Sequence, residues 1–300
     1  MKSILCPLCE INNSRLVNQR REKGLWVTTV ACLGCGLVYH NPVIEDQDRK
    51  DLAISQRQWH TGTALNARQL RKLERRWSLQ WPLIQPVFQP RSRVLEIGCG
   101  LGWAGGRLTS LGGQVWGVEP DPEQAAFARD HWGLTVFPVP FERVDLAGER
   151  FDLILASHVI EHFPDPLAFL LKARTLAHSD TRLFLETPNI LAPKVSFRRL
   201  FSVAHNFYFS PRTLSWLLAK AGWQVARLRV FRRDSFQVLA QASAPQNPEV
   251  PPGANLEPLK AMARHRYLYY LKLLFIWRKI PWWQKYWMYT PDPRYERQRI

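Results

Sequence analysis

Apolar and polar positions divide the chain into stretches of different character. Between residues 91 and 243, short apolar runs of strand length alternate with longer amphipathic stretches of helical period. This alternation is typical of α/β folds, in which helices cover a mostly parallel sheet. The pattern predicts strands near 93–97, 114–118, 134–137, 151–156 and 181–186, helices near 103–111, 122–131, 166–177 and 211–221, and a closing antiparallel pair at 223–231 and 235–241.

The flanking segments have other patterns. Residues 1–45 predict a small unit with a short hairpin that turns at Lys23-Gly24. Residues 46–90 predict a helical cover, whose interleaved arginines and lysines fit a solvated helix face and whose Trp59 and His60 are possible walls of a substrate pocket. Residues 244–258 contain five prolines and predict a linker, and residues 259–300 form a basic, aromatic, helical tail.

Composition limits the class of protein. The chain has 300 residues, of which 46% are apolar, enough for one sizeable core with small appendages. It contains no uninterrupted apolar run of about 18 residues, the length that spans a membrane. The apolar run at the N-terminus is also too short for a signal peptide. We therefore expect a cytoplasmic protein.

Four of the five cysteines form two pairs, Cys6-x-x-Cys9 and Cys32-x-x-Cys35. Paired C-x-x-C sequences separated by a hairpin are typical of zinc ribbons, in which four thiolates surround one Zn²⁺. A closed four-cysteine site has no open coordination position, so the predicted zinc is structural. The metal would supply folding free energy that a segment of this size cannot obtain from apolar burial.

The most informative motif follows the strand predicted at 93–97. It reads Glu96-x-Gly98-x-Gly100-x-Gly102, with Cys99 inside it, and leads into a helix. Closely spaced glycines at such a turn let backbone N–H groups approach a cofactor. The acid before the first glycine distinguishes the motif from the dinucleotide G-x-G-x-x-G sequence. The next predicted strand ends at Glu119, where Rossmann-like sheets place the acid that holds ribose hydroxyls.

Four ordered sequences, E-x-G-x-G-x-G, V-E-P-D, FDLILASHVIEHFPDP and LFLETPN, make the region from 91 to 241 resemble the class I S-adenosylmethionine-dependent methyltransferases. The resemblance implies a doubly wound, Rossmann-like, seven-stranded sheet. It also implies that Glu119 holds the ribose, that Glu96 orients the loop and that Asp121 lies near the adenine. The family's usual acid after the third strand is absent from FPVPFERVD, where Val139, Phe141 or Glu142 would take its place. The remaining cofactor-binding residues implied are Gly98, Cys99, Gly100, Gly102 and Ser157.

Candidates for the acceptor side follow the fourth and fifth strands. His158, Glu161 and His162 occur at i, i+3 and i+4. In sugar-type relatives an E-H pair here is architectural, whereas quinone-ring and RNA-ribose O-methyltransferases bind a divalent metal with E-x-x-E-H. The present chain has His158 where the first acid would be. His205, in a segment that resembles the acceptor-side lid of the sugar-type relatives, is the first choice for a general base and His158 the second.

These observations predict a methyltransferase that resembles the bacterial enzymes of sugars and glycans, with a zinc ribbon and S-adenosylmethionine as cofactor. The expected acceptor is a small-molecule or lipid-linked glycan precursor. The alternatives are a quinone or other lipophilic hydroxyl, RNA, and a non-catalytic adaptor of the same fold. Residues 260–300 carry half of the net charge of +16. We expect this tail to contact a membrane surface on the cytoplasmic side; packing onto the protein and nucleic-acid binding are the alternatives.

Overall fold

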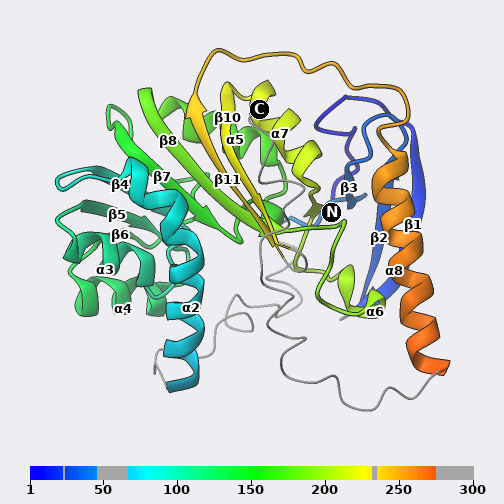
Figure 1. Cartoon of the computed structure of the whole chain (residues 1–300), viewed down its shortest axis with the longest axis horizontal. Helices are drawn as coiled ribbons and strands as arrows, with labels where there is room; N and C mark the ends of the chain where they lie inside the picture. The colour runs from blue at the N-terminus through cyan, green and yellow to red at the C-terminus, as the bar shows by residue number, and fades with distance from the viewer. Residues whose placement is uncertain (23, 46–66, 232–234, 275–300) are drawn as a thin grey trace.

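The computed structural model describes residues 1–22, 24–45, 67–231 and 235–274, whose strands form a large sheet and a small one (Figure 1). The strands are β1 (Ser14–Glu22), β2 (Leu25–Cys32), β3 (Val38–His40), β4 (Arg93–Ile97), β5 (Gln114–Val118), β6 (Thr135–Phe137), β7 (Phe151–Ser157), β8 (Ala177–Pro188), β9 (Phe207–Tyr208), β10 (Trp223–Val230) and β11 (Ser235–Ala242). The helices are α2 (Ala67–Ile84), α3 (Trp103–Ser110), α4 (Pro122–Trp132), α5 (Pro166–Thr175), α6 (Phe197–Leu200), α7 (Pro211–Lys220) and α8 (Leu256–Leu274), with short 3₁₀ turns η2 (Gln85–Val87) and η3 (Ile160–His162).

The large sheet confirms the predicted fold class. Its seven strands run in the order β10-β11-β8-β7-β4-β5-β6. Strands β4 to β8 are parallel, and β11 pairs antiparallel with both β8 and β10. The strand order reverses between β4 and β7, so the carboxyl ends of these two strands open onto the crevice where doubly wound sheets bind ligands.

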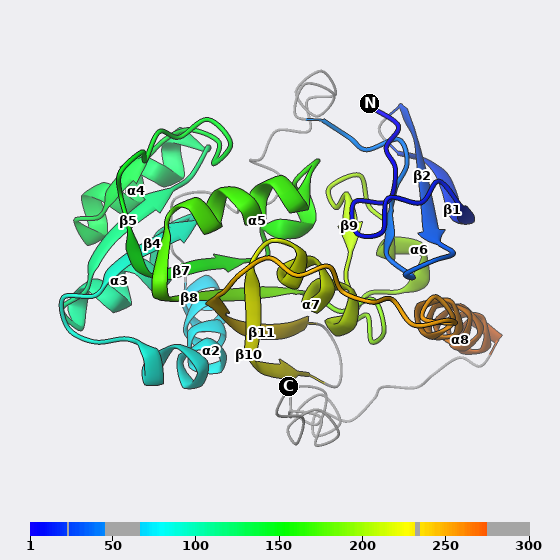
Figure 2. The ribbon, with the colours of Figure 1, turned by 90° about the horizontal axis from the view of Figure 1, so that it is seen from above.

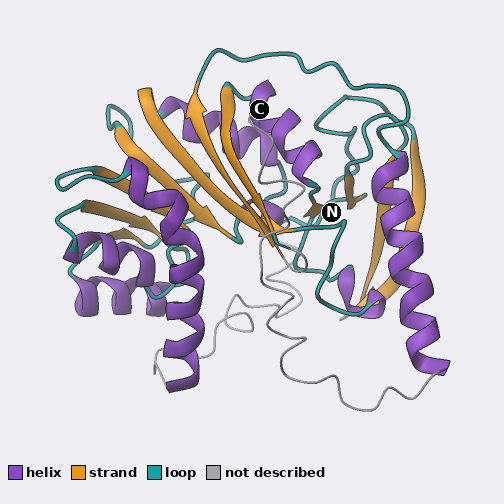
Figure 3. Cartoon of the chain, in the orientation of Figure 1, coloured by secondary structure: helices purple, strands orange, loops and turns teal. Residues whose placement is uncertain are grey.

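Helices cover both faces of this sheet (Figure 3). On one face, Val94 and Leu155 pack in a cluster with residues of α2, α3 and α4. On the other, Leu95 and Ile154 pack with residues of α5 and α7. Burial of alternate side chains on opposite faces explains why these strands appear in the sequence as continuous apolar runs.

The small sheet contains a strand that the sequence analysis missed. Its order is β1-β2-β3-β9, so the unit expected at 1–45 is completed by residues 207–208 of the segment between β8 and α7. Residues 1–45 and the segment between β8 and α7 also share one hydrophobic cluster, in which Leu37 and Tyr39 pack with Phe207 and Phe209. The small sheet is thus joined directly to the part of the chain that carries the large sheet, rather than attached to it by a linker.

Helix α8 lies along the small sheet, beside β1 and β2 (Figures 1 and 2). Met262 of α8 packs in a cluster with Ala31, Val38 and Tyr208. The end of the proline-rich segment packs closely against the turn before β3. A Cβ on Gly36 of that turn would lie only 2.9 Å from Asn255 Cα. The part of the tail that is described therefore packs onto the protein.

Some sequence predictions fall outside the described residues. These are the segment 46–66 with Trp59 and His60, the turn at 232–234, and the tail beyond residue 274. Among the helices that the structure does describe, none has the length and apolar character needed to cross a membrane.

Candidate active site

The glycine-rich loop between β4 and α3 has the backbone that its sequence predicts. Gly98, Gly100 and Gly102 have φ values of +67°, +54° and +69°, a region that glycine adopts without the steric cost of a Cβ. A Cβ on Gly98 would also lie 2.6 Å from Val159 Cγ2. At this position glycine is needed for both its backbone conformation and its small volume.

Two buried carboxylates hold this loop. Glu119 accepts hydrogen bonds from Gly100 N at 2.8 Å and from Asp121 N at 3.0 Å. Glu96 accepts one from Gly105 N at 2.8 Å, in the first turn of α3. Burial raises the pKa of Glu96 to about 8 and also raises the pKa of Glu119. Keeping these two carboxylates ionised in this position therefore costs free energy, as expected of groups that bind a ligand.

A cavity of about 520 Å³ opens at the carboxyl ends of β4, β5 and β7. Of the predicted cofactor-binding residues, those that line it are Glu96, Gly98, Cys99, Gly100, Glu119 and Ser157. Phe141 and Glu142, two of the three candidates for the missing adenine-side acid, also line it. The cavity is of the size that encloses a cofactor-sized ligand.

Two predicted cofactor residues shape the site without lining the cavity. Asp121 caps α4, and its Oδ1 accepts hydrogen bonds from Glu123 N at 3.0 Å and Gln124 N at 3.2 Å. Gly102 caps α3, where a Cβ would lie 2.8 Å from Ala128 Cβ. Asp121 therefore caps the helix through Oδ1, and its expected contact with adenine stays a prediction.

His158 lies between two buried carboxylates. Its Nδ1 is 3.3 Å from Glu161 Oε1, and its Nε2 is 3.7 Å from Glu186 Oε1. Burial alone would lower the pKa of His158, but the interactions with Glu161 and Glu186 raise it to about 9. The ring is consequently an imidazolium near neutral pH, which argues against His158 as a general base.

Glu186 is a functional candidate that the sequence analysis missed. Its Oε2 accepts a hydrogen bond from Gln80 Nε2 at 2.7 Å and one from Ser157 Oγ at 3.4 Å. Gln80 also donates to Ser157 Oγ at 2.9 Å, so α2 is joined to the ends of β7 and β8. The sequence feature that could have identified Glu186 is a carboxylate in the apolar run LFLETPN, because a buried strand normally has apolar residues there.

Glu161, His162 and His205 meet at the cavity wall. Each offers a ligand atom, and these atoms lie within 4.8 Å of one another. His162 Nδ1 is 2.8 Å from Ala204 O, so a proton on Nδ1 leaves the lone pair of the neutral ring on Nε2. Burial and the neighbouring His162 lower the pKa of His205 to about 3, so His205 is neutral near neutral pH. The structure thus brings the first-choice base to the cavity as a neutral ring, while the low pKa makes it a weaker proton acceptor than an exposed histidine.

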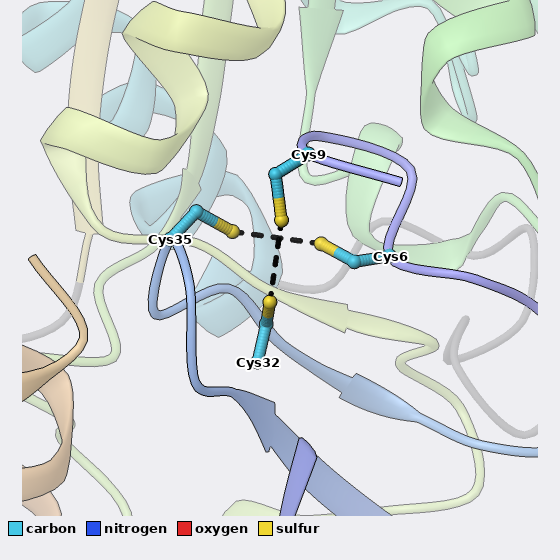
Figure 4. Close-up of side chains that lie close together, drawn as sticks. All are labelled: Cys6, Cys9, Cys32 and Cys35. Atoms are coloured by element: carbon cyan, nitrogen blue, oxygen red, sulfur yellow. Dashed lines mark hydrogen bonds between the residues drawn. The ribbon is translucent and has the colours of Figure 1, made fainter. Parts of the chain in front are cut away.

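The four paired cysteines converge on one point, as Figure 4 shows. Their sulfur atoms lie within 4.8 Å of one another, with Cys6 and Cys35 3.5 Å apart and Cys9 and Cys32 3.3 Å apart. Tetrahedral zinc with Zn–S bonds of about 2.3 Å separates its sulfurs by roughly 3.8 Å. The cluster therefore suits zinc after small adjustments, while Cys99 lies apart from it in the cofactor loop.

Comparison with known proteins agrees with this geometry. A family model described as a methyltransferase domain matches residues 67–228. Two relatives are named ubiquinone biosynthesis O-methyltransferase. The protein of Cereibacter sphaeroides is 32% identical over 146 residues, which cover 43% of this chain and 59% of the relative. The protein of Xanthomonas campestris is 36% identical over 110 residues, which cover 34% and 46%. The chain thus spans about half the length of these relatives.

Among solved structures, the PH0226 protein of Pyrococcus horikoshii superposes with a TM-score of 0.50 at 17% identity, covering 59% of this chain and 93% of that one. This similarity concerns the fold. The family match covers more than half of the chain and includes the glycine-rich loop, Glu119 and the cavity wall from His158 to His205. The chain therefore belongs to the methyltransferase domain family, and its fold is that of the class I S-adenosylmethionine-dependent methyltransferases.

Proposed function

We propose that the chain methylates a sugar hydroxyl of a surface glycan or of its nucleotide-linked or lipid-linked precursor. The observation that carries this proposal is the composition of the cavity wall opposite the glycine-rich loop. There a neutral histidine, His205, faces the same cavity as two cationic side chains of α2, Lys72 and Arg76. A hydroxyl acceptor needs a proton acceptor, and a phosphorylated precursor needs cations.

The cationic residues form one face of α2. Lys72 and Arg76 are four positions apart, so their side chains extend from the same side of the helix, and both line the cavity. Gln80, one further turn along, bonds to Ser157 at the strand ends. With a rise of about 1.5 Å per residue, Arg76 and Lys72 lie roughly 6 and 12 Å beyond Gln80 along the helix axis. Neither forms one of the close ion pairs seen in the described part of the chain, although the charge of Arg76 also acts on Glu186 and His158. Both cations therefore face the cavity in reach of a phosphate or diphosphate.

The residues present fit the transfer chemistry. S-adenosylmethionine supplies an electrophilic methyl group bonded to a sulfonium. The acceptor oxygen forms the new O–CH₃ bond as the C–S bond breaks, and the bonding pair stays on sulfur to give S-adenosylhomocysteine. His205 takes the hydroxyl proton. The Glu161 carboxylate, within 4.8 Å of it, stabilises the imidazolium that forms.

A variant pair tests the acceptor assignment. The change Lys72→Gln with Arg76→Gln removes both cavity-facing cations, and we expect it to raise the KM for a nucleotide sugar by about 10-fold or more with little change in kcat. The matched control is Arg71→Gln with Arg75→Gln, which removes two cations of the same helix that do not line the cavity. An equal effect of both pairs on KM, or none of either, would contradict a phosphate-binding role.

A quinone or other lipophilic hydroxyl is the second candidate, because the two relatives above carry that name. In such enzymes a divalent metal assists the reaction, and Glu161, His162 and His205 could hold one here. Glu161 Oε1 is buried without a hydrogen bond of good geometry, which fits a metal ligand. His158, however, places positive charge 3.3 Å from that oxygen, so the site suits zinc or iron better than magnesium. Methylation of quinone precursors that needs a second equivalent of zinc or iron beyond the one held by the four cysteines, and that loses this need in Glu161→Gln, would favour this candidate.

We also propose that the tail, residues 259–300, contacts a membrane surface. It would bring a lipid-linked acceptor to the cavity, and Tyr267 is 64% exposed on α8. Binding to vesicles of anionic lipid by the full chain, but not by a chain ending at residue 274, is the expected result. RNA remains the third acceptor, and binding to it would weaken steeply with salt.

A further inference from the structure

We infer that the zinc ribbon is a structural part of the acceptor side of the active site, and that Asn206 is the positioning residue that joins the two. This inference concerns the site of the proposed reaction but does not depend on which acceptor is used. It rests on contacts between residues that are far apart in the sequence.

The first contact is between backbones. β9 pairs antiparallel with β3, with Val38 opposite Tyr208 and Tyr39 opposite Phe207. His40 N donates to Asn206 O at 2.8 Å, which extends the ladder by one residue. The cavity residue His205 directly precedes this ladder. The position of its backbone is therefore set by the ribbon sheet.

The second contact is the side chain of Asn206, which is fully buried. Its Oδ1 accepts from Ile44 N at 2.9 Å, and its Nδ2 donates to Ile44 O at 2.9 Å and to His162 O at 3.2 Å. Asn206 N donates to Glu161 O at 2.8 Å. One amide thus joins the ribbon to the η3 turn, which carries two cavity residues.

The third contact links this network to the cysteine cluster. Cys32 ends β2, and β3 begins three positions after Cys35. Cys32 N donates to Leu37 O at 2.9 Å, so the metal-binding turn and the start of β3 move as one unit. Bound zinc would hold this turn in place, and pairing with β3 positions β9. β9 and the Asn206 amide in turn position His205, His162 and Glu161. The glycine-rich loop packs against Val159 beside η3, but its own backbone hydrogen bonds run to Val118 and Glu119 rather than to β9 or η3.

The inference predicts a separation of two functions. Losing the Asn206 amide displaces His205 and η3, and displacements of about 1 Å can cost roughly 100-fold in rate. We therefore expect Asn206→Ala to lower kcat by about this factor. The affinity for S-adenosylhomocysteine should stay within about 3-fold of the wild type, because Gly100 and Glu119 are untouched.

Asn41→Ala is the matched control. Asn41 makes the same kind of two-bond pair, accepting from Ile4 N at 3.1 Å and donating to Ile4 O at 3.1 Å. This pair lies within the ribbon, and among the described residues the hydrogen bonds of Asn41 run to Ile4 and Thr28. Loss of ribbon stability alone would affect both variants in the same way.

Hydrogen exchange and calorimetry test the inference without any acceptor. In zinc-loaded Asn206→Ala we expect amide exchange to rise about 10-fold or more in peptides 158–164 and 202–208, with peptide 96–105 unchanged and S-adenosylhomocysteine still bound. Zinc-free Cys32→Ser should show the same pattern together with faster exchange in the ribbon. The inference is overturned if exchange in Asn206→Ala rises only within residues 1–45, or if Asn41→Ala gives the same pattern. It is also overturned if Asn206→Ala loses affinity for S-adenosylhomocysteine together with its protection from amide exchange. A protein that binds the cofactor yet fails on every acceptor would refute the proposed function and leave this inference standing.

Discussion

The change Glu119→Gln tests how the protein binds its cofactor. In the structure Glu119 holds Gly100 N and Asp121 N, one with each oxygen. The glutamine amide keeps one acceptor and turns an NH₂ donor toward the other N–H group. A hydrogen bond to an ionised group contributes about 1.5–3 kcal/mol, so losing one bond and opposing two donors costs roughly 2–3 kcal/mol. We expect S-adenosylhomocysteine to bind about 30- to 150-fold more weakly.

Titration calorimetry near neutral pH measures this difference. The control is Glu123→Gln, an identical change in an exposed side chain of α4. Because burial raises the pKa of Glu119, acidification should weaken binding to the wild type before ordinary carboxyl groups titrate. In Glu119→Gln this part of the pH dependence should disappear. Affinity within about 3-fold of the wild type, or an equal loss in the Glu123 control, would refute the reasoning.

Three further changes follow from the geometry of the cavity. His205→Gln should lower kcat by about 100-fold or more while calorimetry shows unchanged cofactor affinity, and retained activity would remove His205 as the base. Gly98→Ala, with its Cβ 2.6 Å from Val159 Cγ2, should abolish measurable cofactor binding while the melting temperature falls only slightly. His158→Asn keeps a residue that tolerates the φ of +57° but removes the charge. The pKa of His158 is raised to about 9, so its stabilising contribution is full below the pKa of the unfolded chain, near 6.5, and is lost as pH rises through about 9. The difference in unfolding free energy between wild type and His158→Asn should therefore shrink over that range in denaturant titrations; a difference independent of pH would contradict the charged state of His158.

Much of the large sheet could be predicted from the sequence because its elements are defined locally. The strand at Arg93–Ile97 is a short apolar run that ends in glycines, and the helix at Pro122–Trp132 begins with a capping Asp and a proline. The cofactor loop was predictable for the same reason. Glycine at 98 and 100 permits the positive φ that the structure shows at both positions.

The acceptor side could not be predicted as well, because it depends on contacts between distant residues. β9 is two residues long, and nothing in its sequence indicates that it pairs with residues near position 39. The sequence placed His205 before His158 as the candidate base, and the structure keeps that order. The sequence did not indicate that His158 is charged, because this depends on Glu161 and also on Glu186, 28 positions later in the chain. Local sequence does not show which carboxylate a histidine will meet.

Methyl transfer to a sugar precursor can be tested by following the methyl group itself. Purified zinc-loaded protein is incubated with methyl-labelled S-adenosylmethionine and separate pools of nucleotide sugars, lipid-linked glycans, quinone precursors and RNA. We predict label in the nucleotide-sugar or lipid-linked glycan pool, and loss of that label with His205→Gln. Label confined to quinone precursors or to RNA would contradict the account.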